Sequence, residues 1–292
     1  MRQHRIVSWL PLVAGLIWGT AFPAIEIGLR TFSPLDVAFW RGFIGALSLG
    51  GWLAIQGGLH WRFPRATWVR LFVLALAGSG LFWPIQSVAV NLSTPVNVAF
   101  LITTYPAMLS ASGFLLGEEV RRRDVASLVL ALAGAYLIIS DGKLLRLFAS
   151  QTLPGDTLAL VAAVSFAAYI LLGRRWRETM GISSQTLTFY TFALAVPVLL
   201  LFTFTDGSSL TPPTIMTAGA VVWLGLMATT VAFLAVNRGM QSGAISRSSV
   251  HLLVIPLVTA IVSWVLFGIA LTVPQWIGGV LVLAGIANSS RI

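Results

Sequence analysis

Long apolar stretches alternate with short polar connections along the whole chain. Each stretch is close to the 20 or so residues that an α-helix needs to cross roughly 30 Å of hydrocarbon, at about 1.5 Å per residue. The pattern therefore predicts ten membrane-spanning helices and an all-α integral membrane fold, without a soluble domain between the spans. The predicted spans cover residues 6–28, 35–55, 66–89, 95–116, 122–140, 155–173, 184–204, 213–236, 247–268 and 274–290.

Composition agrees with this prediction. Hydrophobic residues make up 57% of the 292 residues and charged residues only 9%, whereas about a quarter of the residues of a soluble domain are charged. Arg2 and Arg5 precede an apolar run that is too long for a signal peptide and lacks a small-residue cleavage site, so we expect the first span there. The chain has no cysteine, which excludes disulfides and thiol chemistry.

Positive charges lie almost entirely on one side of the predicted membrane. The formal net charge is +9. Placing the N-terminus in the cytoplasm puts 14 of the 18 Lys and Arg residues on that side and three on the other, with Arg41 inside the second span. This distribution follows the positive-inside rule and predicts cytoplasmic N- and C-termini. The basic clusters are short and lie at span ends, so we expect no nucleic-acid partner.

The two halves of the chain resemble each other. A shift of 151 residues places VLALAG at 129–134 on VLVLAG at 280–285, and a shift of 148 places Trp18 on Phe166. Each shift joins one span to the span five places later, which predicts a duplicated five-helix unit. Because five is odd, the second copy must cross the membrane in the opposite orientation, as in inverted-repeat transporters. The two predicted repeats are residues 1–145 and 146–292.

Two prolines occupy equivalent positions within the spans of the two halves. A shift of 150 residues places Pro106 of the fourth span on Pro256 of the ninth. Proline removes a backbone hydrogen bond from a helix interior, and matched interruptions in two repeats are typical of a midplane binding site with hinges. The alternative is a tolerated kink, which membrane helices often contain. Because the prolines are matched, we favour the functional interpretation.

Aromatic and polar side chains recur at helical spacing on several spans, so that each group shares one face of its helix. Such faces can line a mostly apolar pocket with a few orienting polar groups. For the histidine among them, the alternatives are a group that titrates near neutral pH and a hydrogen-bonded core residue. The predicted lining residues are Trp18, Phe22, Phe82, Trp83, Gln86, Asn97, Leu101, Thr104, Tyr105, Met108, Ser165, Tyr169, Trp223, Met227, Thr230, Asn237 and His251.

Charge inside the spans is sparse, and two residues stand out. Glu26 and Arg41 lie near the outer ends of the first and second spans, which a short connection joins. Burying either residue alone costs several kcal/mol, so we expect the two to form an ion pair. The alternative is that Arg41 attracts a substrate carboxylate or that Glu26 carries a coupling proton.

The sequence offers little that an enzyme would need. The three histidines, His4, His60 and His251, are far apart, and neither an H-E-x-x-H nor a G-x-S-x-G motif occurs. We therefore expect no catalytic residues, no metal site and no cofactor. The expected partners are a small-molecule substrate and the lipid bilayer, without an obligate protein partner.

Four motifs follow one another in order along the chain. They are WGTAF in the first span, FWRGFIGAL around Arg41 in the second, TTYPAMLSASGFLLGEE in the fourth, and the closing GGVLVLAG. With these motifs the chain resembles the drug/metabolite transporter superfamily, and within it the ten-span exporters with two EamA domains. The resemblance covers nearly the whole chain. The second half departs from the pattern where Glu118 would recur, because the aligned residue is Ile269.

This resemblance implies an alternating-access exporter of small metabolites in the bacterial inner membrane, with a central cavity lined by spans one, three, four, six, eight and nine. The aromatic lining and the few charges are similar to the branch that exports aromatic and other neutral amino acids, and we expect such substrates. A cation drug pump would need an unpaired intramembrane carboxylate, and carriers of sugar phosphates would need several intramembrane cations. The alternative is a broad-range metabolite or drug exporter with the same fold.

Overall fold

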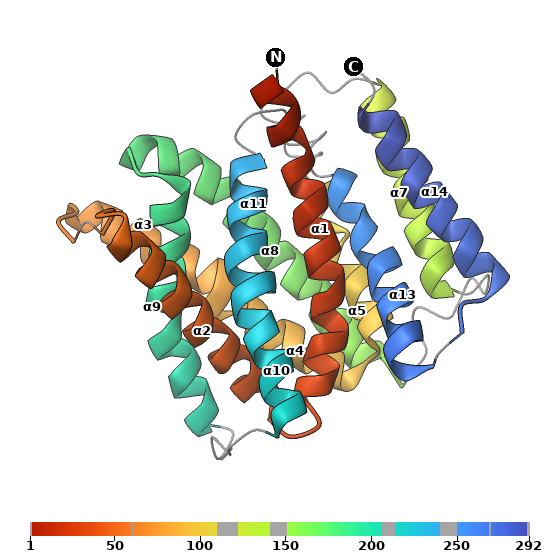
Figure 1. Ribbon diagram of the computed structural model, residues 1–292, viewed down its shortest axis with the longest axis horizontal. Helices are drawn as coiled ribbons and strands as arrows, with labels where there is room; N and C mark the ends of the chain where they lie inside the picture. The colour runs from red at the N-terminus through yellow and green to blue at the C-terminus, as the bar shows by residue number, and fades with distance from the viewer. Residues whose placement is uncertain are drawn as a thin grey trace.

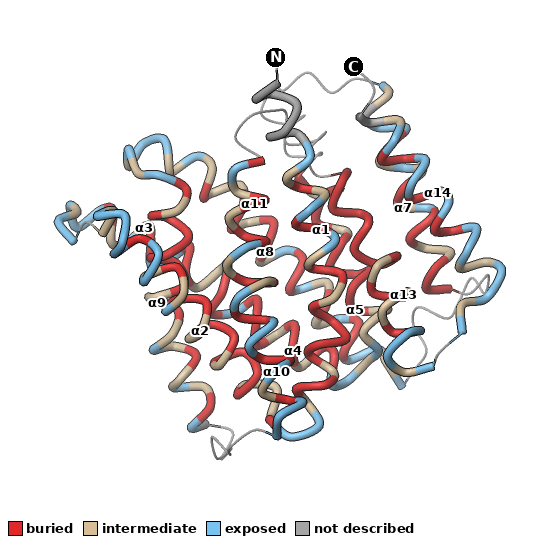
Figure 2. Tube along the Cα trace, viewed as in Figure 1, coloured by how far each residue is buried: buried red, intermediate tan, exposed pale blue. Residues whose placement is uncertain are grey.

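Helices account for almost all of the described chain. The computed structural model describes residues 2–59, 61–109, 122–140, 151–205, 214–239, 250–268 and 270–290, and no strand occurs in these ranges. The two ends of the chain lie at the same end of the molecule (Figure 1). Buried residues lie where the helices face one another, and exposed residues lie on their outer sides (Figure 2).

Six helices are long and apolar enough to cross a membrane, and four shorter apolar helices accompany them in the described ranges. Each falls on one of the apolar stretches of the sequence. The six are Trp9–Gly28 within α1 (Arg2–Gly28), α2 (Pro34–Ile55), Arg65–Leu92, α8 (Leu153–Met180), Ser184–Phe204 within α9 (Ser184–Thr205), and Ile215–Gly239. The four are Pro95–Leu109, Val125–Ser140 within α7 (Arg122–Ser140), His251–Phe267, and Val273–Asn288 within α14 (Val273–Ser290).

Local sequence explains where several helices begin. The Ser33 hydroxyl caps α2 by accepting a hydrogen bond from the Asp36 backbone N–H at 3.1 Å. Thr94 caps α5 (Pro95–Ile102) in the same way, through the Asn97 N–H at 3.2 Å. A hydroxyl at the cap satisfies an N–H that has no partner within the helix, and the proline that follows each cap has no N–H to satisfy.

Two of the long helices are interrupted by π-helix at equivalent places in the two halves. The interruptions are η1 (Leu76–Gly80) and η3 (Leu224–Val231), whose starts differ by 148 residues. This is the same shift that aligns Trp18 with Phe166. Short π-helical turns are frequent at functional sites. In the first half, η1 lies between α3 (Arg65–Ala75) and α4 (Phe82–Leu92). In the second half, η3 lies between α10 (Ile215–Trp223) and α11 (Ala232–Gly239).

The fourth and ninth predicted spans are each broken just before their proline. A turn separates α5 from the helical segment in which Pro106 is the second residue. In the second half, the 3-10 helix η4 (His251–Val254) precedes α13 (Ile255–Phe267), in which Pro256 is the second residue. A proline at the start of a helix costs no hydrogen bond. The expectation that each proline breaks a continuous helix interior is therefore wrong, although the matched interruptions are present.

Small residues bring the backbone of α1 close to η4 and α13. A Cβ added at Gly19 would lie 2.4 Å from Val258 Cβ, and one added at Gly15 would lie 3.2 Å from the His251 carbonyl oxygen. Thr259 donates a hydrogen bond to the Gly19 carbonyl at 2.8 Å. Membrane helices commonly approach one another at such small residues.

The helices α7 and α14 lie side by side at one edge of the molecule (Figure 1). Two glycines allow this close approach: a Cβ added at Gly134 would lie 2.5 Å from the Gly278 carbonyl oxygen, and one added at Gly278 would lie 2.4 Å from the Gly134 carbonyl oxygen. The two similar hexamers of the sequence thus lie on helices that contact each other.

Candidate functional site

Arg41 of α2 is a buried positive charge, with 2% of the residue exposed. Its Nε donates a hydrogen bond to the Thr229 hydroxyl at 2.8 Å, and its Nη1 donates to Gln86 Oε1 at 2.8 Å. The guanidinium carbon lies 5.2 Å from the ring centroid of Trp83, which is a cation–π contact. Because α4 supplies Gln86 and Trp83 and η3 supplies Thr229, the arginine joins the two halves of the chain.

Arg41 has no acidic partner among the described residues. Its contacts are all neutral, and they use two of the five N–H donors of a guanidinium. The expected ion pair with Glu26 does not form: α1 directs Glu26 into a separate pocket beside α5 and α13, whereas α2 directs Arg41 toward α4 and η3. A buried charge without a counter-charge costs several kcal/mol. Stability alone therefore does not account for this arginine.

A narrow cavity adjoins Arg41, and both halves of the chain contribute to its wall. Its volume is about 20 Å³, which is room for one water molecule. Half of the ten lining residues are aromatic. The lining residues are Trp18, Ala21, Phe22, Arg41, Phe82, Gln86, Ile102, Tyr105, Phe166 and Ile255.

Phe166 of α8 contacts several of the other rings in this wall. Its ring centroid lies 5.6 Å from that of Trp18, 4.7 Å from that of Phe82 and 5.0 Å from that of Tyr105. Such aromatic pairs each contribute about 0.5–1.5 kcal/mol beyond the area they bury. Trp18 Nε1 also donates a hydrogen bond to the Ala228 carbonyl of η3 at 2.7 Å. Contacts from both halves therefore fix the orientation of the rings.

Two buried polar atoms beside the cavity have no hydrogen-bond partner among the described residues. They are the hydroxyl of Tyr105, a residue that is 1% exposed, and Nε1 of Trp83, which is fully buried. Buried polar groups are nearly always hydrogen-bonded. Tyr105 lines the cavity, so its hydroxyl is a candidate for contact with a ligand.

The structure brings together part of the predicted lining. Five predicted residues line the cavity itself. Trp83 does not line it but packs against the guanidinium of Arg41, which does. These five come from α1, α4 and the helical segment that begins after α5. They are Trp18, Phe22, Phe82, Gln86 and Tyr105.

Three predicted polar residues instead join helices to one another. Ser165 donates a hydrogen bond to a carbonyl of η1 at 2.8 Å. Asn237 Nδ2 donates to the Thr188 hydroxyl at 2.6 Å, and the hydroxyls of Thr230 and Ser48 lie 2.6 Å apart. These bonds satisfy partly buried polar groups.

The other predicted lining residues also lie outside the cavity. Trp223 is 41% exposed and donates from Nε1 to the Thr20 hydroxyl at 2.8 Å. His251 is buried, and its ring packs edge-on against Trp9 with centroids 6.0 Å apart. Helical spacing identifies residues that share a face, but it does not say which way that face points. The remaining members of this group are Asn97, Leu101, Thr104, Met108, Tyr169 and Met227.

Sequence reasoning missed four lining residues and one partner of the arginine. The partner is Thr229, whose role depends on the π-helix η3. Phe166 did have a signal, because the 148-residue shift aligns it with Trp18 and the two rings are in contact. The others are apolar residues in apolar helices, where no pattern marks them. The four missed lining residues are Ala21, Ile102, Phe166 and Ile255.

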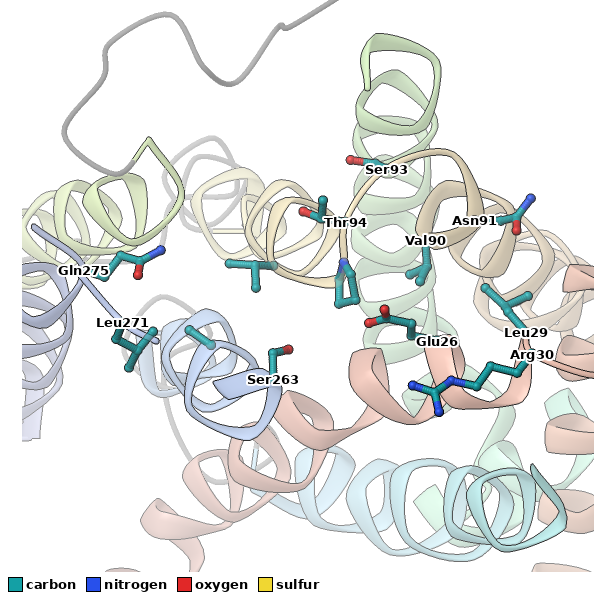
Figure 3. A pocket seen from close by; sticks show the side chains of 13 residues that line it. Glu26, Leu29, Arg30, Val90, Asn91, Ser93, Thr94, Ser263, Leu271 and Gln275 are labelled. Atoms are coloured by element: carbon teal, nitrogen blue, oxygen red, sulfur yellow. The ribbon is translucent and has the colours of Figure 1, made fainter. Parts of the chain in front are cut away.

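A second and larger pocket lies at the end of α1 that is remote from the chain termini (Figures 1 and 3). We call it the outer pocket. Its volume is about 420 Å³, which is within the range of small-molecule sites. Its lining residues are Glu26, Leu29, Arg30, Val90, Asn91, Ser93, Thr94, Pro95, Val96, Ala260, Ser263, Leu271 and Gln275.

Comparison with known proteins decides the family. The sequence profile of the EamA-like transporter family matches residues 5–140 and, a second time, residues 153–291. The chain belongs to the EamA-like transporter family. It is therefore a multi-pass membrane transporter of the drug/metabolite transporter superfamily, and its role is not enzymatic.

Three relatives of this EamA-like transporter align with nearly all of it. A protein of Archaeoglobus fulgidus, named as an uncharacterized transporter, is 30% identical over 93% of this chain and 92% of its own. YyaM of Bacillus subtilis is 26% identical over 99% and 95%, and the inner membrane transporter YedA of Escherichia coli is 25% identical over 96% and 91%. A crystal structure that is 21% identical superimposes with a TM-score of 0.80 over 98% of both chains, which shows the common fold.

Proposed function

We propose that this EamA-like transporter exports aromatic and other neutral amino acids by alternating access, through the cavity beside Arg41. The proposal includes ten spans in two inverted five-helix repeats, residues 1–145 and 146–292, with both termini in the cytoplasm and the protein in a bacterial inner membrane. The double match to the family profile and the matched π-helices support the repeats. The positive-inside distribution of charge supports the orientation.

The unpaired guanidinium of Arg41 is the observation that carries this proposal. A substrate carboxylate would supply the missing counter-charge and accept N–H donors that the described protein groups do not use. Every α-amino acid has such a carboxylate. A cationic drug would meet the same positive charge and no carboxylate in the cavity lining.

The aromatic wall suits the remainder of an aromatic amino acid. Its side chain would pack among rings of the kind that surround Phe166, and edge-to-face or stacked pairs favour such contacts. The ammonium group would meet ring faces and the Tyr105 hydroxyl, which has no partner among the described residues. The site thus offers a group for each part of the substrate.

The cavity must widen to admit such a substrate, because its present volume is far below that of an amino acid. The breaks in the helices are placed where such a change is needed. Tyr105 and Ile255 line the cavity, and each directly precedes one of the matched prolines, Pro106 and Pro256. Broken helices with matched prolines are the usual moving parts of inverted-repeat transporters. We propose these prolines as hinges.

Transport by proteoliposomes tests the function. The assay measures uptake of labelled L-phenylalanine, other amino acids and cationic dyes, with and without a pH gradient. Arg41→Met should lower the apparent affinity for L-phenylalanine by about 10- to 150-fold, because a charged hydrogen-bonded pair contributes about 1.5–3 kcal/mol. Arg70→Met is the matched control, because Arg70 lies outside the cavity and donates to the Thr179 hydroxyl at 3.1 Å.

Two results would contradict the proposal. Unchanged phenylalanine transport by Arg41→Met would remove the anchoring role of the arginine. Transport of dyes without any amino acid would instead favour the broad-range drug exporter.

A further inference from the structure

The outer pocket lies directly beyond the cavity along the same helices. On α1, Phe22 lines the cavity and Glu26, one turn later, lines the outer pocket. On α4, Gln86 and Val90 have the same relation, and α5 and α13 also contribute to both. Four residues of helix rise about 6 Å. A solute that leaves the cavity toward this end of the molecule therefore enters the outer pocket after a displacement of one helical turn.

One negative and one positive side chain stand together in the outer pocket. Glu26 lies near the end of α1, and Arg30 lies in the turn that follows the helix, where its backbone N–H donates to the Ile27 carbonyl at 3.2 Å. Both side chains line the outer pocket, and in Figure 3 they extend in different directions from the end of α1. Their charges interact, but these two described residues share no hydrogen bond. The guanidinium of Arg30 also lies 5.6 Å from the ring centroid of Phe267, which fixes it beside α13.

Ser263 of α13 supplies a third polar group. The residue is 3% exposed and lines the outer pocket, and its hydroxyl has no hydrogen-bond partner among the described residues. Other hydroxyls of the wall are occupied, since Ser93 donates to Asp156 at 2.6 Å and Thr94 accepts from the Asn97 backbone at 3.2 Å. A buried hydroxyl without a partner in a pocket wall indicates a place for a ligand atom.

We propose that the outer pocket binds the zwitterion of an α-amino acid, with the ammonium group at Glu26 and the carboxylate at Arg30. This inference rests on the proposed function, because it makes the pocket the second binding position on the exit path. The two charges of a zwitterion are attached to one carbon atom, so a single ligand can contact both a carboxylate and a guanidinium that line the same pocket. A simple carboxylate would leave Glu26 unpaired, and a simple amine would leave Arg30 unpaired.

The two sites then select differently. The described lining of the cavity holds a single cation, Arg41, whereas the outer pocket holds charges of both signs. An aromatic carboxylate without an amino group pairs with Arg41 in the cavity, but in the outer pocket it supplies no positive charge for Glu26. The requirement for a complete amino acid therefore comes from the outer pocket, which in this structure is also the site with room for one.

A cysteine at Asn91 can report occupation of the outer pocket, because the natural chain contains no cysteine. Asn91 is exposed and lines the pocket. In the purified full-length protein, L-phenylalanine should slow maleimide labelling of Asn91→Cys at least fivefold. The probes 3-phenylpropionate, which lacks the ammonium group, and 2-phenylethylamine, which lacks the carboxylate, should have little effect. Thr31→Cys is the matched control, because Thr31 is exposed just beyond α1 and does not line the pocket.

Removing either charge should abolish the protection. Glu26→Gln keeps the size of the side chain, and Arg30→Gln replaces the guanidinium with a shorter, uncharged polar group. Each is combined with Asn91→Cys. Arg30 is exposed, so its substitution should leave the fold intact, as elution volume and unchanged labelling of Thr31→Cys would show. Protection that persists in both charge variants, or that either analogue provides equally, would overturn the proposal.

The Arg41→Met background separates this inference from the proposed function. Protection of Asn91→Cys by L-phenylalanine should persist there, since the outer pocket does not include Arg41. Loss of protection in that background would mean that the label reports the cavity, and would overturn the outer site. If L-phenylalanine protects Asn91→Cys but the natural chain transports no amino acid, only the proposed function is contradicted. If the natural chain transports L-phenylalanine but Asn91→Cys is not protected, only the outer site is contradicted.

Discussion

The hydroxyl of Thr229 tests whether Arg41 is held as the structure shows. Thr229→Val keeps the shape of the side chain but removes the acceptor that lies 2.8 Å from Arg41 Nε. A hydrogen bond to a charged group contributes about 1.5–3 kcal/mol, and Arg41 is only 2% exposed, so bulk water does not replace the lost acceptor. We therefore expect the free energy of unfolding to fall by about 2 kcal/mol.

A double-mutant cycle isolates this bond from the other effects of Thr229→Val. In an Arg41→Met background the same substitution should cost less than about 0.5 kcal/mol, because no guanidinium remains to be satisfied, and the coupling energy should be about 1.5–3 kcal/mol. Thr191→Val is the matched control, since Thr191 is also buried but donates to the carbonyl of Thr188 in its own helix at 2.9 Å. Its coupling to Arg41→Met should be near zero.

Reversible unfolding in mixed micelles, followed by far-UV circular dichroism, measures the free energy of unfolding of the natural protein, both single variants and the double variant of each cycle. A Thr229 coupling no larger than that of Thr191 would refute the assignment of Thr229 as a partner of the arginine. Phenylalanine affinity gives a second measurement, because an arginine with a missing partner should also hold the substrate carboxylate less firmly.

Two further predictions concern the architecture. Gly134→Ala should destabilise the protein by about 1–3 kcal/mol because the new Cβ would meet the Gly278 carbonyl oxygen, whereas Gly51→Ala, with nothing within 4 Å of the added Cβ, should be neutral or slightly stabilising in the same unfolding assay. Cysteines at Thr31 and Gln56, which flank α2, should react with an impermeant maleimide from opposite faces of the membrane; reaction from one face would contradict the proposed topology.

The positions of the helices were predictable from the sequence. The apolar stretches at 35–55 and 184–204 coincide closely with α2 and α9, because the thickness of the hydrocarbon sets the length of an apolar helix. The shift of 150 residues also paired the interruptions at Pro106 and Pro256. The π-helices η1 and η3, whose starts differ by 148 residues, were not predicted. What the sequence did not show is that Pro106 and Pro256 begin helical segments and do not interrupt them.

The candidate site was predictable only in part. Trp18 and Trp223 have similar apolar neighbours along the chain, yet Trp18 lines the cavity and Trp223 is 41% exposed. In a soluble helix the polar face would separate them, but lipid is as apolar as the interior of a membrane protein. The proximity of Glu26 and Arg41 in sequence likewise predicted an ion pair, whereas their helices direct them to different pockets.

The amino-acid sequence by itself determined the apolar helices, the likeness of the two halves and the placement of most positive charges at span ends, because each depends on the local order of residues and on the solubility of that segment in lipid. Only the tertiary structure decided which side chains face the interior. That choice placed Arg41 against Gln86 and Thr229, set Phe166 among the rings of both halves, and stacked the outer pocket on the cavity. The physical reason is that rotating an apolar helix about its axis costs little in lipid, so that packing against its neighbours fixes the inward face.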